Sequence, residues 1–224
     1  MKKLLLVVLC VYSGSLFSQK DSLDVGDSYW EDQLYLGVTF NELMKQPSGA
    51  LGNGFSYGLN TGYIKDIALV KSGKLAIGIG LGYAYDALRH GFKLSRQNNS
   101  MVIDVDAGSQ SSGNLRMHSL EIPLEFRWRT SASNKYKFWR VYAGVKMNYN
   151  LKNSMSYSEN ATYSMHTNLS RFNKVQFGLT LAAGYASFNF KVDYGLTPIL
   201  KDADIGTVSI RSRILRFGMI FYIL

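Results

Sequence analysis

The sequence predicts an all-β fold, an eight-stranded antiparallel up-and-down transmembrane β-barrel after a cleaved signal peptide, and three observations support this prediction. Apolar and polar residues alternate with period two in eight separate segments, as in strands whose two faces meet different surroundings. A leader with a basic start, an apolar core and small residues precedes them. Short and long connections alternate along the chain, as in outer-membrane barrels with periplasmic turns and external loops.

The leader is assigned to residues 1–18. Lys2 and Lys3 give the basic start, residues 4–12 form the apolar core, and small residues run to Ser18. A core of nine residues is too short to cross hydrocarbon, which takes about 20 residues in a helix. Residues 19–32 are then predicted to be a periplasmic lead-in, and residues 33–224 to form the outer-membrane β-barrel.

Charge and cysteine content limit the functions that the chain can have. Cys10 is the only cysteine, so the processed chain is expected to hold no disulfide, thiolate metal site or cysteine nucleophile. Cleavage would remove two lysines and no acid, which lowers the formal net charge from +9 to +7. For a secreted chain this basic charge favours lipid phosphates and acidic sugars as partners, and not nucleic acid.

The first four predicted strands are residues 33–41, 54–64, 75–88 and 115–129. Every second residue in them is mostly apolar or aromatic, from Leu34 in the first to Trp128 in the fourth. The third strand has glycines at 78, 80 and 82, each of which would cost about 1 kcal/mol in a helix. A face of small residues instead suits the interior of a narrow barrel. Residues 65–74 are a short connection, and 42–53 and 97–114 are long ones, the latter a loop or the tips of long strands.

The last four predicted strands are residues 138–149, 175–185, 188–196 and 207–224, with strand character in the first of these continuing to Tyr157. Short connections at 130–137 and near Ala186 alternate with polar loops at 158–170 and 198–206. The final strand is apolar on one face through Leu215, Phe217 and Ile223. The order of short and long connections places both termini in the periplasm.

Period two does not by itself say which face is inside, and a soluble lipocalin-like barrel is the alternative. Three features favour lipid outside the barrel. The charged strand residues share the minority face, most strand glycines lie on that same face, and Trp128 and Trp139 stand at strand ends on the apolar face. Tryptophans at these positions are typical of the aromatic belt at a membrane interface.

The charged minority face predicts a network inside the barrel. Its members are Glu121, Glu125, Arg127, Arg129, Arg140, Lys146, Lys191, Asp193 and Arg216. Glu121 and Glu125 are about 13 Å apart along one strand, too far for a carboxylate pair of a glycosidase type. Arg127, Arg140 or Lys146 are therefore the expected partners of these carboxylates, and the network is predicted to form an ionic plug. Arg211 and Arg213 are predicted at the outer end of the last strand, where they would contact lipopolysaccharide phosphates.

Three stretches of the chain resemble a known family. They are residues 119–126 (Ser-Leu-Glu-Ile-Pro-Leu-Glu-Phe), Tyr142-Ala143-Gly144 and the glycine-spaced hairpin from Gly178 to Gly195. Together they resemble the PorT-like outer-membrane β-barrel family of Bacteroidota. The resemblance implies an outer-membrane barrel, and the family's namesake takes part in type IX protein secretion. Most relatives have no assigned role.

The sequence favours a non-enzymatic barrel with a structural or accessory role in envelope transport or secretion. A narrow porin-like channel or small-ligand carrier is one alternative, and an outer-membrane lipid hydrolase that uses His118 or His166 is another. No catalytic, metal-binding or cofactor-binding residue is assigned. The expected partners are outer-membrane lipid and lipopolysaccharide, the barrel-assembly machinery during biogenesis, and an envelope or secretion protein. The barrel is expected to be a monomer.

Overall fold

A computed structural model provides the fold. It describes residues 32–46, 54–97, 100–105, 112–130, 138–159, 162–186, 188–201, 204–205, 208–209 and 211–223. The predicted signal peptide and all of the predicted lead-in except Asp32 lie outside the described residues. No helix in these ranges has the length and apolar character needed to cross a membrane.

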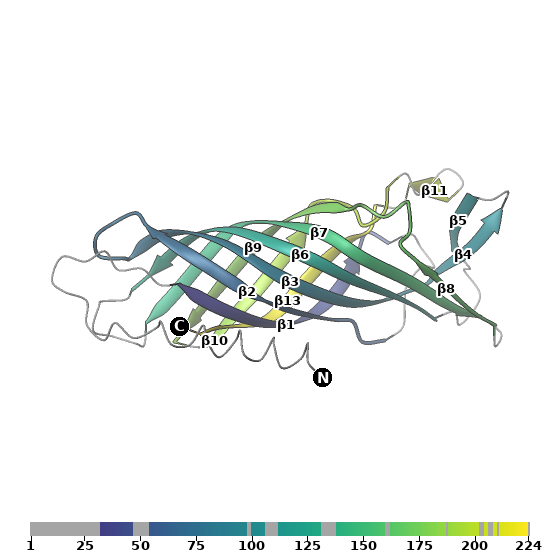
Figure 1. The fold of residues 1–224 in the computed structure, drawn as a ribbon. Coiled ribbons are helices and arrows are strands. Elements are labelled where there is room, and N and C mark those ends of the chain that lie inside the picture. Colours follow the sequence, from purple (N-terminus) through teal and green to yellow (C-terminus); the bar gives the residue numbers. More distant parts are fainter. Residues whose placement is uncertain are drawn as a thin grey trace, which may run out of the picture.

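Eight strands form a closed antiparallel barrel (Figure 1). They are β1 (Gln33–Met44), β2 (Tyr57–Ala68), β3 (Leu75–His90), β6 (Ser112–Arg129), β7 (Trp139–Glu159), β9 (Val175–Tyr185), β10 (Phe188–Gly195) and β13 (Arg213–Ile223). Each pairs with the next of these strands along the chain, and β13 pairs with β1 from Arg213 opposite Met44 to Ile223 opposite Leu34. The predicted eight-stranded antiparallel up-and-down barrel is confirmed.

Five further strands lie outside the barrel wall. They are β4 (Phe92–Gln97), β5 (Ser100–Val105), β8 (Thr162–Thr167), β11 (Asp204–Ile205) and β12 (Val208–Ser209). Figure 1 shows β4, β5, β8 and β11 beyond one end of the barrel, which we call the loop end. The opposite end, which carries the short connection between β2 and β3, is the turn end.

The loops predicted at 158–170 and 198–206 are wrong in part, because they contain β8 and β11. The stretch predicted at 97–114 as a loop or the tips of long strands contains β5 and the start of β6, and β13 begins at Arg213 instead of 207. The physical reason is that β8 pairs with the far part of β7, from Ser154 opposite Thr167 to Glu159 opposite Thr162. β8 is only six residues long, and its alternation of Tyr163 and Met165 with Ser164 and His166 is too brief to indicate a strand from sequence.

The outward face of the barrel is apolar and the inward face is polar. Side chains such as Leu34, Phe126 and Leu181 are at least half exposed on the outside, whereas Arg127 and Arg129 are fully buried inside. This arrangement is the reverse of a soluble barrel, which buries its apolar face. Lys65 is an exception on the outward face, and its long aliphatic stem allows the charge to reach an interface.

A band of apolar residues encircles the outward face. On β7 it runs from Trp139 to Tyr149, ten residues apart, and Leu75 to Tyr85 on β3 has the same length. A tilted membrane strand crosses the hydrocarbon in about 9–11 residues, so the band matches a bilayer. Trp128 and Trp139 both lie at its turn end, where they are outward-facing and exposed, and the Trp139 ring lies 5.4 Å from that of Tyr185.

Glycines on the inward face make room for larger side chains. A Cβ at Gly82 would collide with the hydroxyl of Tyr35, and a Cβ at Gly78 would lie 2.6 Å from Nε of Arg127. A Cβ at Gly58 would lie 2.6 Å from the Thr39 hydroxyl. A real Cβ atom would not lie this close to another heavy atom. The glycines therefore leave space for the polar side chains in their present positions.

An apolar plug fills the loop end of the barrel. Its buried members are Leu43, Leu88, Phe92, Leu115, Met117, Met155, Leu169, Phe172, Ile199, Leu200 and Ile214. Six of them come from inward positions of barrel strands and five from the connections. An antiparallel bridge between Phe172 and Leu200 joins two of these connections. The connections therefore fold back to close this end of the barrel.

Candidate functional site

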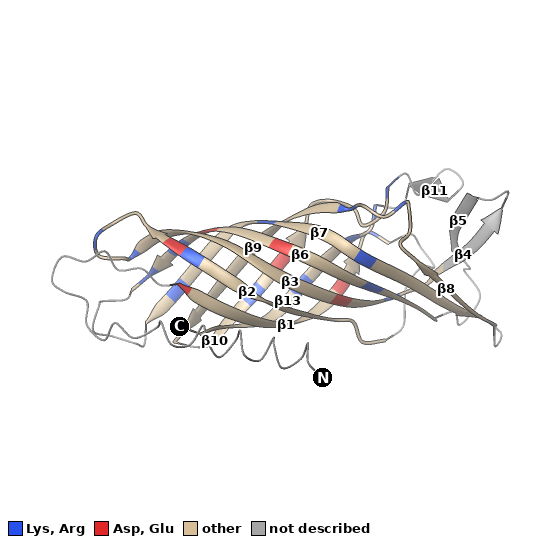
Figure 2. Ribbon diagram, in the orientation of Figure 1, with Lys and Arg blue, Asp and Glu red and all other residues tan. Residues whose placement is uncertain are grey.

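The charged side chains of the barrel interior form the candidate functional site. Figure 2 shows acidic and basic residues along the barrel strands. The structure places all nine residues of the predicted network in buried positions. It adds Asp66 on β2 and Asp86 on β3, which sequence reasoning did not single out and which are also buried. Continuing the period-two parity of each strand would have found both, since each lies an even number of residues from an inward glycine.

The turn-end cluster is built on Asp66. Its two carboxylate oxygens bind two different arginines: Oδ1 lies 2.5 Å from Arg127 and Oδ2 lies 2.7 Å from Arg129. Nε of Arg127 also donates to Glu125 at 3.0 Å, and Nε of Arg129 donates to the Gly73 carbonyl at 2.7 Å. Four side chains from β2 and β6 are thus held together by charge-assisted hydrogen bonds.

Aromatic rings cover the guanidinium of Arg127. Its central carbon lies 4.4 Å from the ring centre of Tyr142 and 5.4 Å from that of Tyr222. These distances fit cation–π contacts, which strengthen where water is excluded. Gln33 accepts a further hydrogen bond from Arg127 at 3.1 Å. Arg127 therefore links residues from both ends of the chain.

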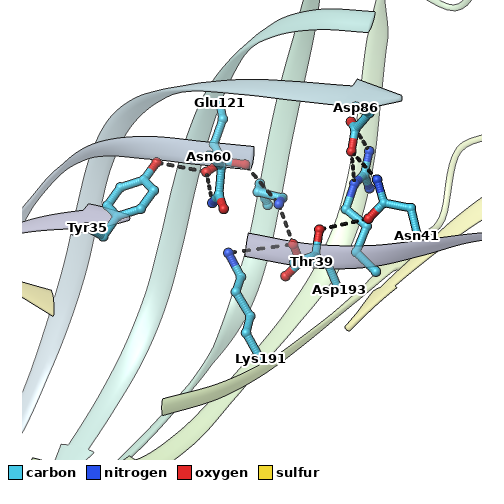
Figure 3. A network of polar contacts seen from close by, with 10 residues as sticks. Tyr35, Thr39, Asn41, Asn60, Asp86, Glu121, Lys191 and Asp193 are labelled. Atoms are coloured by element: carbon cyan, nitrogen blue, oxygen red, sulfur yellow. Dashed lines mark hydrogen bonds and ion pairs between the residues drawn. The ribbon is translucent and has the colours of Figure 1, made fainter. Parts of the chain in front are cut away.

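The central cluster is built on Glu121 (Figure 3). Its Oε1 accepts hydrogen bonds from the Tyr35 hydroxyl at 2.8 Å and from the Asn60 amide at 2.9 Å. Its Oε2 lies 2.9 Å from Nζ of Lys146, which also lies 2.5 Å from Asp193. Lys191 approaches the same Asp193 oxygen at 3.6 Å.

The loop-end cluster is built on Asp86. Arg216 donates to both of its oxygens, from Nε at 2.9 Å and from Nη2 at 2.7 Å. Asn41 donates to the same carboxylate at 2.7 Å, and the Thr39 hydroxyl donates to Asn41 at 2.8 Å. Two parallel bonds between a guanidinium and a carboxylate are the strongest ion-pair geometry that side chains offer.

Two of the three cations predicted as possible partners of Glu121 and Glu125 bind these carboxylates. Arg127 binds Glu125, and Lys146 binds Glu121. Arg140 instead donates to the carbonyl of Ala186 and lies 4.3 Å above the ring of Phe138. Arg140 lies at the turn end of the barrel because it is the second residue of β7.

The interior is nearly balanced in charge. The buried side chains among the described residues include six cations (Arg127, Arg129, Arg140, Lys146, Lys191 and Arg216) and five carboxylates (Asp66, Asp86, Glu121, Glu125 and Asp193). Removing a charge from water costs several kcal/mol unless a partner compensates it. The ion pairs of the three clusters provide that compensation for five of these cations, and Arg140 donates to the Ala186 carbonyl and lies over the Phe138 ring.

Little empty space remains between the clusters. A cavity of about 10 Å³ lies between the central and loop-end clusters, with Asn60, Asp86, Glu121, Lys146 and Arg216 among its lining residues. This is room for about one water molecule. The arrangement can hold charge and bind water, and it leaves no space there for a solute to pass.

The remaining predicted residues, Arg211, Arg213, His118 and His166, lie outside the charged interior, and His166 is half-exposed on β8. Arg211 is exposed just before β13, and Arg213 is half-exposed at the first residue of that strand. His118 is half-exposed on β6, and its Nδ1 is 2.5 Å from the hydroxyl of Tyr83. His90 is buried and stacks against Phe92. No group of three or more histidine, cysteine or acidic side chains in the described part of the chain is placed to hold a metal ion.

Residues 17–201 match the family described as outer membrane protein beta-barrel domain. No curated protein matches the sequence. Among solved structures, the chain is similar to Ail, the attachment invasion locus protein of Yersinia pestis, in complex with the heparin analogue sucrose octasulfate. The identity is 11%, the TM-score is 0.40, and the match covers 87% of this chain and 100% of that one.

A second structure of Ail from Yersinia pestis matches with 10% identity and a TM-score of 0.35, again over 87% of this chain and 100% of that one. A structure described under "Asymmetric conductivity of engineered proteins" matches with 9% identity and a TM-score of 0.23 over the same shares. At these TM-scores nothing is transferred from the three structures to this chain.

Proposed function

The chain belongs to the outer membrane protein beta-barrel domain family, and from this premise we propose that it is a non-enzymatic, non-conducting barrel with a structural or accessory role in envelope transport or secretion. The observation that carries the proposal is the filled interior. Five buried carboxylates and six buried cations engage one another or neighbouring groups across the lumen. We further propose that the chain is a PorT-like outer-membrane barrel from Bacteroidota.

Two barriers in series support the closed state. The ionic clusters fill the middle of the barrel and leave a cavity of about 10 Å³. The apolar plug fills the loop end with side chains such as Leu88, Met117 and Phe172, each at most 2% exposed. An ion would have to displace charged pairs and then cross an apolar barrier, which costs several kcal/mol without compensating ligands.

The loop end supports an accessory role. β7 continues ten residues beyond Tyr149 to Glu159 and carries β8 along its far part. β6 extends beside it from Ser112. Structure that projects beyond the apolar band adds nothing to crossing the membrane, so we assign this end the contact with an envelope or secretion protein.

The orientation and lipid contacts are part of the same proposal. We place both termini in the periplasm, because Gln33 and Ile223 lie at the turn end and the longer connections lie at the other end. Arg213 then lies ten residues from Ile223, at the outer border of the band, where we expect Arg211 and Arg213 to meet lipopolysaccharide phosphates. Insertion requires the barrel-assembly machinery, and we take the barrel to act as a monomer.

A conductance measurement distinguishes the closed barrel from the alternative, a narrow channel or small-ligand carrier. In planar lipid bilayers we expect the purified barrel to give no conductance steps, because the cavity between the central and loop-end clusters has room for about one water molecule. A known open barrel channel inserted in the same bilayers serves as the positive control. Insertion of the protein is verified by recovering the folded form from the membrane.

Regular conductance steps from verified, folded protein would contradict the closed barrel and favour the channel. Steps that appear only after the loop end is proteolysed would show that the apolar plug is the barrier and that the ionic clusters alone do not block conductance.

The lipid hydrolase alternative meets a geometric obstacle. Ser119 is 6% exposed and faces the interior, whereas His118 faces outward and its Nδ1 contacts Tyr83. A base and a nucleophile must come within hydrogen-bond reach of each other, and these two neighbours point to opposite faces of the wall. The geometry at His118 therefore favours a binding role over a catalytic one.

A further inference from the structure

An outward cluster of basic and tyrosine side chains lies at the loop-end border of the apolar band. On β6, His118 is ten residues from Trp128, and on β3, Tyr85 is ten residues from Leu75. Leu75 pairs with Trp128 at one border, and Tyr85 pairs with His118 at the other. Since about 9–11 residues of a tilted strand cross the hydrocarbon, His118 lies at the level of the lipid headgroups.

Tyrosine side chains border this cluster on the side of the apolar band. The His118 ring lies 5.0 Å from that of Tyr85 and 6.1 Å from that of Tyr83, whose hydroxyl contacts Nδ1 at 2.5 Å. Tyr57 continues the row, with its ring 6.2 Å from that of Tyr85. Tyrosine, like tryptophan, is enriched at membrane interfaces, with its ring toward the acyl chains and its hydroxyl toward the headgroups.

A β-bulge adds a cation to the cluster. His118 pairs with Lys152 and Ser119 pairs with Asn150, which leaves Leu151 as the extra residue on β7. As a result Leu151 and Lys152 are both exposed, although successive strand residues ordinarily point to opposite faces. The bulge thus places Lys152, as an exposed residue, opposite His118 in the pairing of β6 with β7.

Arg116 completes the cluster. It lies two residues beyond His118 on the same outward face of β6 and is exposed. Side chains that pair directly across strands lie about 4.5–5.5 Å apart at Cβ, and diagonal neighbours about 7–8 Å apart. One phosphate can therefore be reached by all three groups. Ser154, which pairs with Arg116, marks the far side of the cluster. From the apolar band to this level, no acidic side chain in the described part of β3, β6 or β7 faces outward.

We propose that Arg116, His118 and Lys152 bind a phosphate of the glycolipid in the outer leaflet, the lipid A part of lipopolysaccharide. Phosphate suits the donors, because arginine and lysine bind its oxygens by charge-assisted hydrogen bonds. A lipid suits the location, because acyl chains of the same molecule can lie along Tyr83 and Leu120 below the cluster. The inference rests on the proposed orientation, with the loop end outside, and it is independent of whether the barrel conducts.

The test uses the folded, purified barrel in detergent and measures bound lipid A by native mass spectrometry. The R116A/K152A variant is compared with K71A/K74A, which removes two exposed lysines at the turn end. A basic residue near an anionic lipid surface contributes about fivefold in affinity, so we expect R116A/K152A, which removes two, to bind bis-phosphorylated lipid A about 25-fold more weakly. We expect K71A/K74A to bind as the parent does, and dephosphorylated lipid A to bind all three proteins equally.

Two further arms sharpen the result. R116K/K152R is expected to keep most of the affinity, which shows that charge and not a packing change is responsible. Excess inorganic phosphate is expected to leave lipid A bound. Full displacement by inorganic phosphate would overturn the lipid assignment in favour of a free-anion site.

Equal binding of lipid A by R116A/K152A and K71A/K74A would overturn the proposal, as would a loss that is the same for dephosphorylated lipid. The R211S/R213S variant in the same assay tests the separate lipid contact of the proposed function, so the two can fail independently. Conductance from the parent protein would contradict the closed barrel and leave this site unaffected.

Discussion

Replacing Asp66 with alanine is expected to destabilise the barrel by about 3–5 kcal/mol, the range for removing one partner of a buried ion pair. Asp66 is fully buried and binds Arg127 at 2.5 Å and Arg129 at 2.7 Å. Its removal leaves two buried guanidinium groups with one carboxylate, Glu125, in the turn-end cluster. The measurement is the denaturant midpoint of unfolding in detergent micelles, followed by the mobility difference between folded and unfolded protein on gels.

Asp32→Ala is the matched control for this experiment. Asp32 is exposed and accepts a hydrogen bond from the Tyr63 hydroxyl at 2.6 Å, so its removal is expected to cost less than about 1 kcal/mol. Similar midpoints for Asp66→Ala and the parent protein would show that the two arginines do not depend on this carboxylate.

The double substitution Glu121→Ala, Glu125→Ala is expected to abolish the heat resistance of the folded barrel in detergent. Glu121 accepts bonds from Tyr35 and Asn60 and pairs with Lys146, while Glu125 pairs with Arg127. The interior would keep six buried cations with three carboxylates, and each unpaired buried charge costs several kcal/mol. The temperature at which gel mobility changes to that of the unfolded chain reports the loss.

The isosteric pair Glu121→Gln, Glu125→Gln separates charge from hydrogen bonding. Glutamine can still accept from Tyr35 and Asn60, so we expect heat resistance between that of the parent and that of the alanine variant. Full heat resistance in the alanine variant would mean that the ionic plug contributes nothing to stability.

The barrel could be predicted from the sequence because the two faces of each strand have different surroundings, which determine the residue type at every second position. Lipid outside and a crowded interior sort side chains by parity, so strands such as 75–88 are visible without a neighbour. The same parity assigned Glu121, Arg127 and Lys146 to the inward face, where the structure places them. The prediction missed β8, which pairs with the far part of β7 beyond the apolar band, whereas the continuation of β7 to Tyr157 was predicted and the strand extends to Glu159. Beyond the band the outward face has no hydrocarbon contact, so a strong period-two pattern is not required there.

It is harder to predict which side chains bind one another inside the barrel than to predict whether a residue points inward or outward. Arg216 binds Asp86 across 130 positions of sequence, from strands that are not neighbours in the wall. Such contacts depend on the stagger of the strands and on the width of the lumen, which a single sequence does not encode as a local pattern. Asp66 was missed for a simpler reason, because the predicted second strand ended at 64 and β2 continues to Ala68.

The central claim is that hydrocarbon contacts the apolar outward face while the charged face is enclosed. Leu124, Val145 and Leu179 test it most directly, since they form one outward row across β6, β7 and β9 in the middle of the band. With Cys10 replaced by serine, a cysteine at one of these positions is the only site for a nitroxide label. In lipid bilayers we predict that each label collides with oxygen and is shielded from a water-soluble nickel chelate, whereas a label at Lys71 shows the reverse. Nickel accessibility at Leu124, Val145 and Leu179 equal to that at Lys71 would contradict the account.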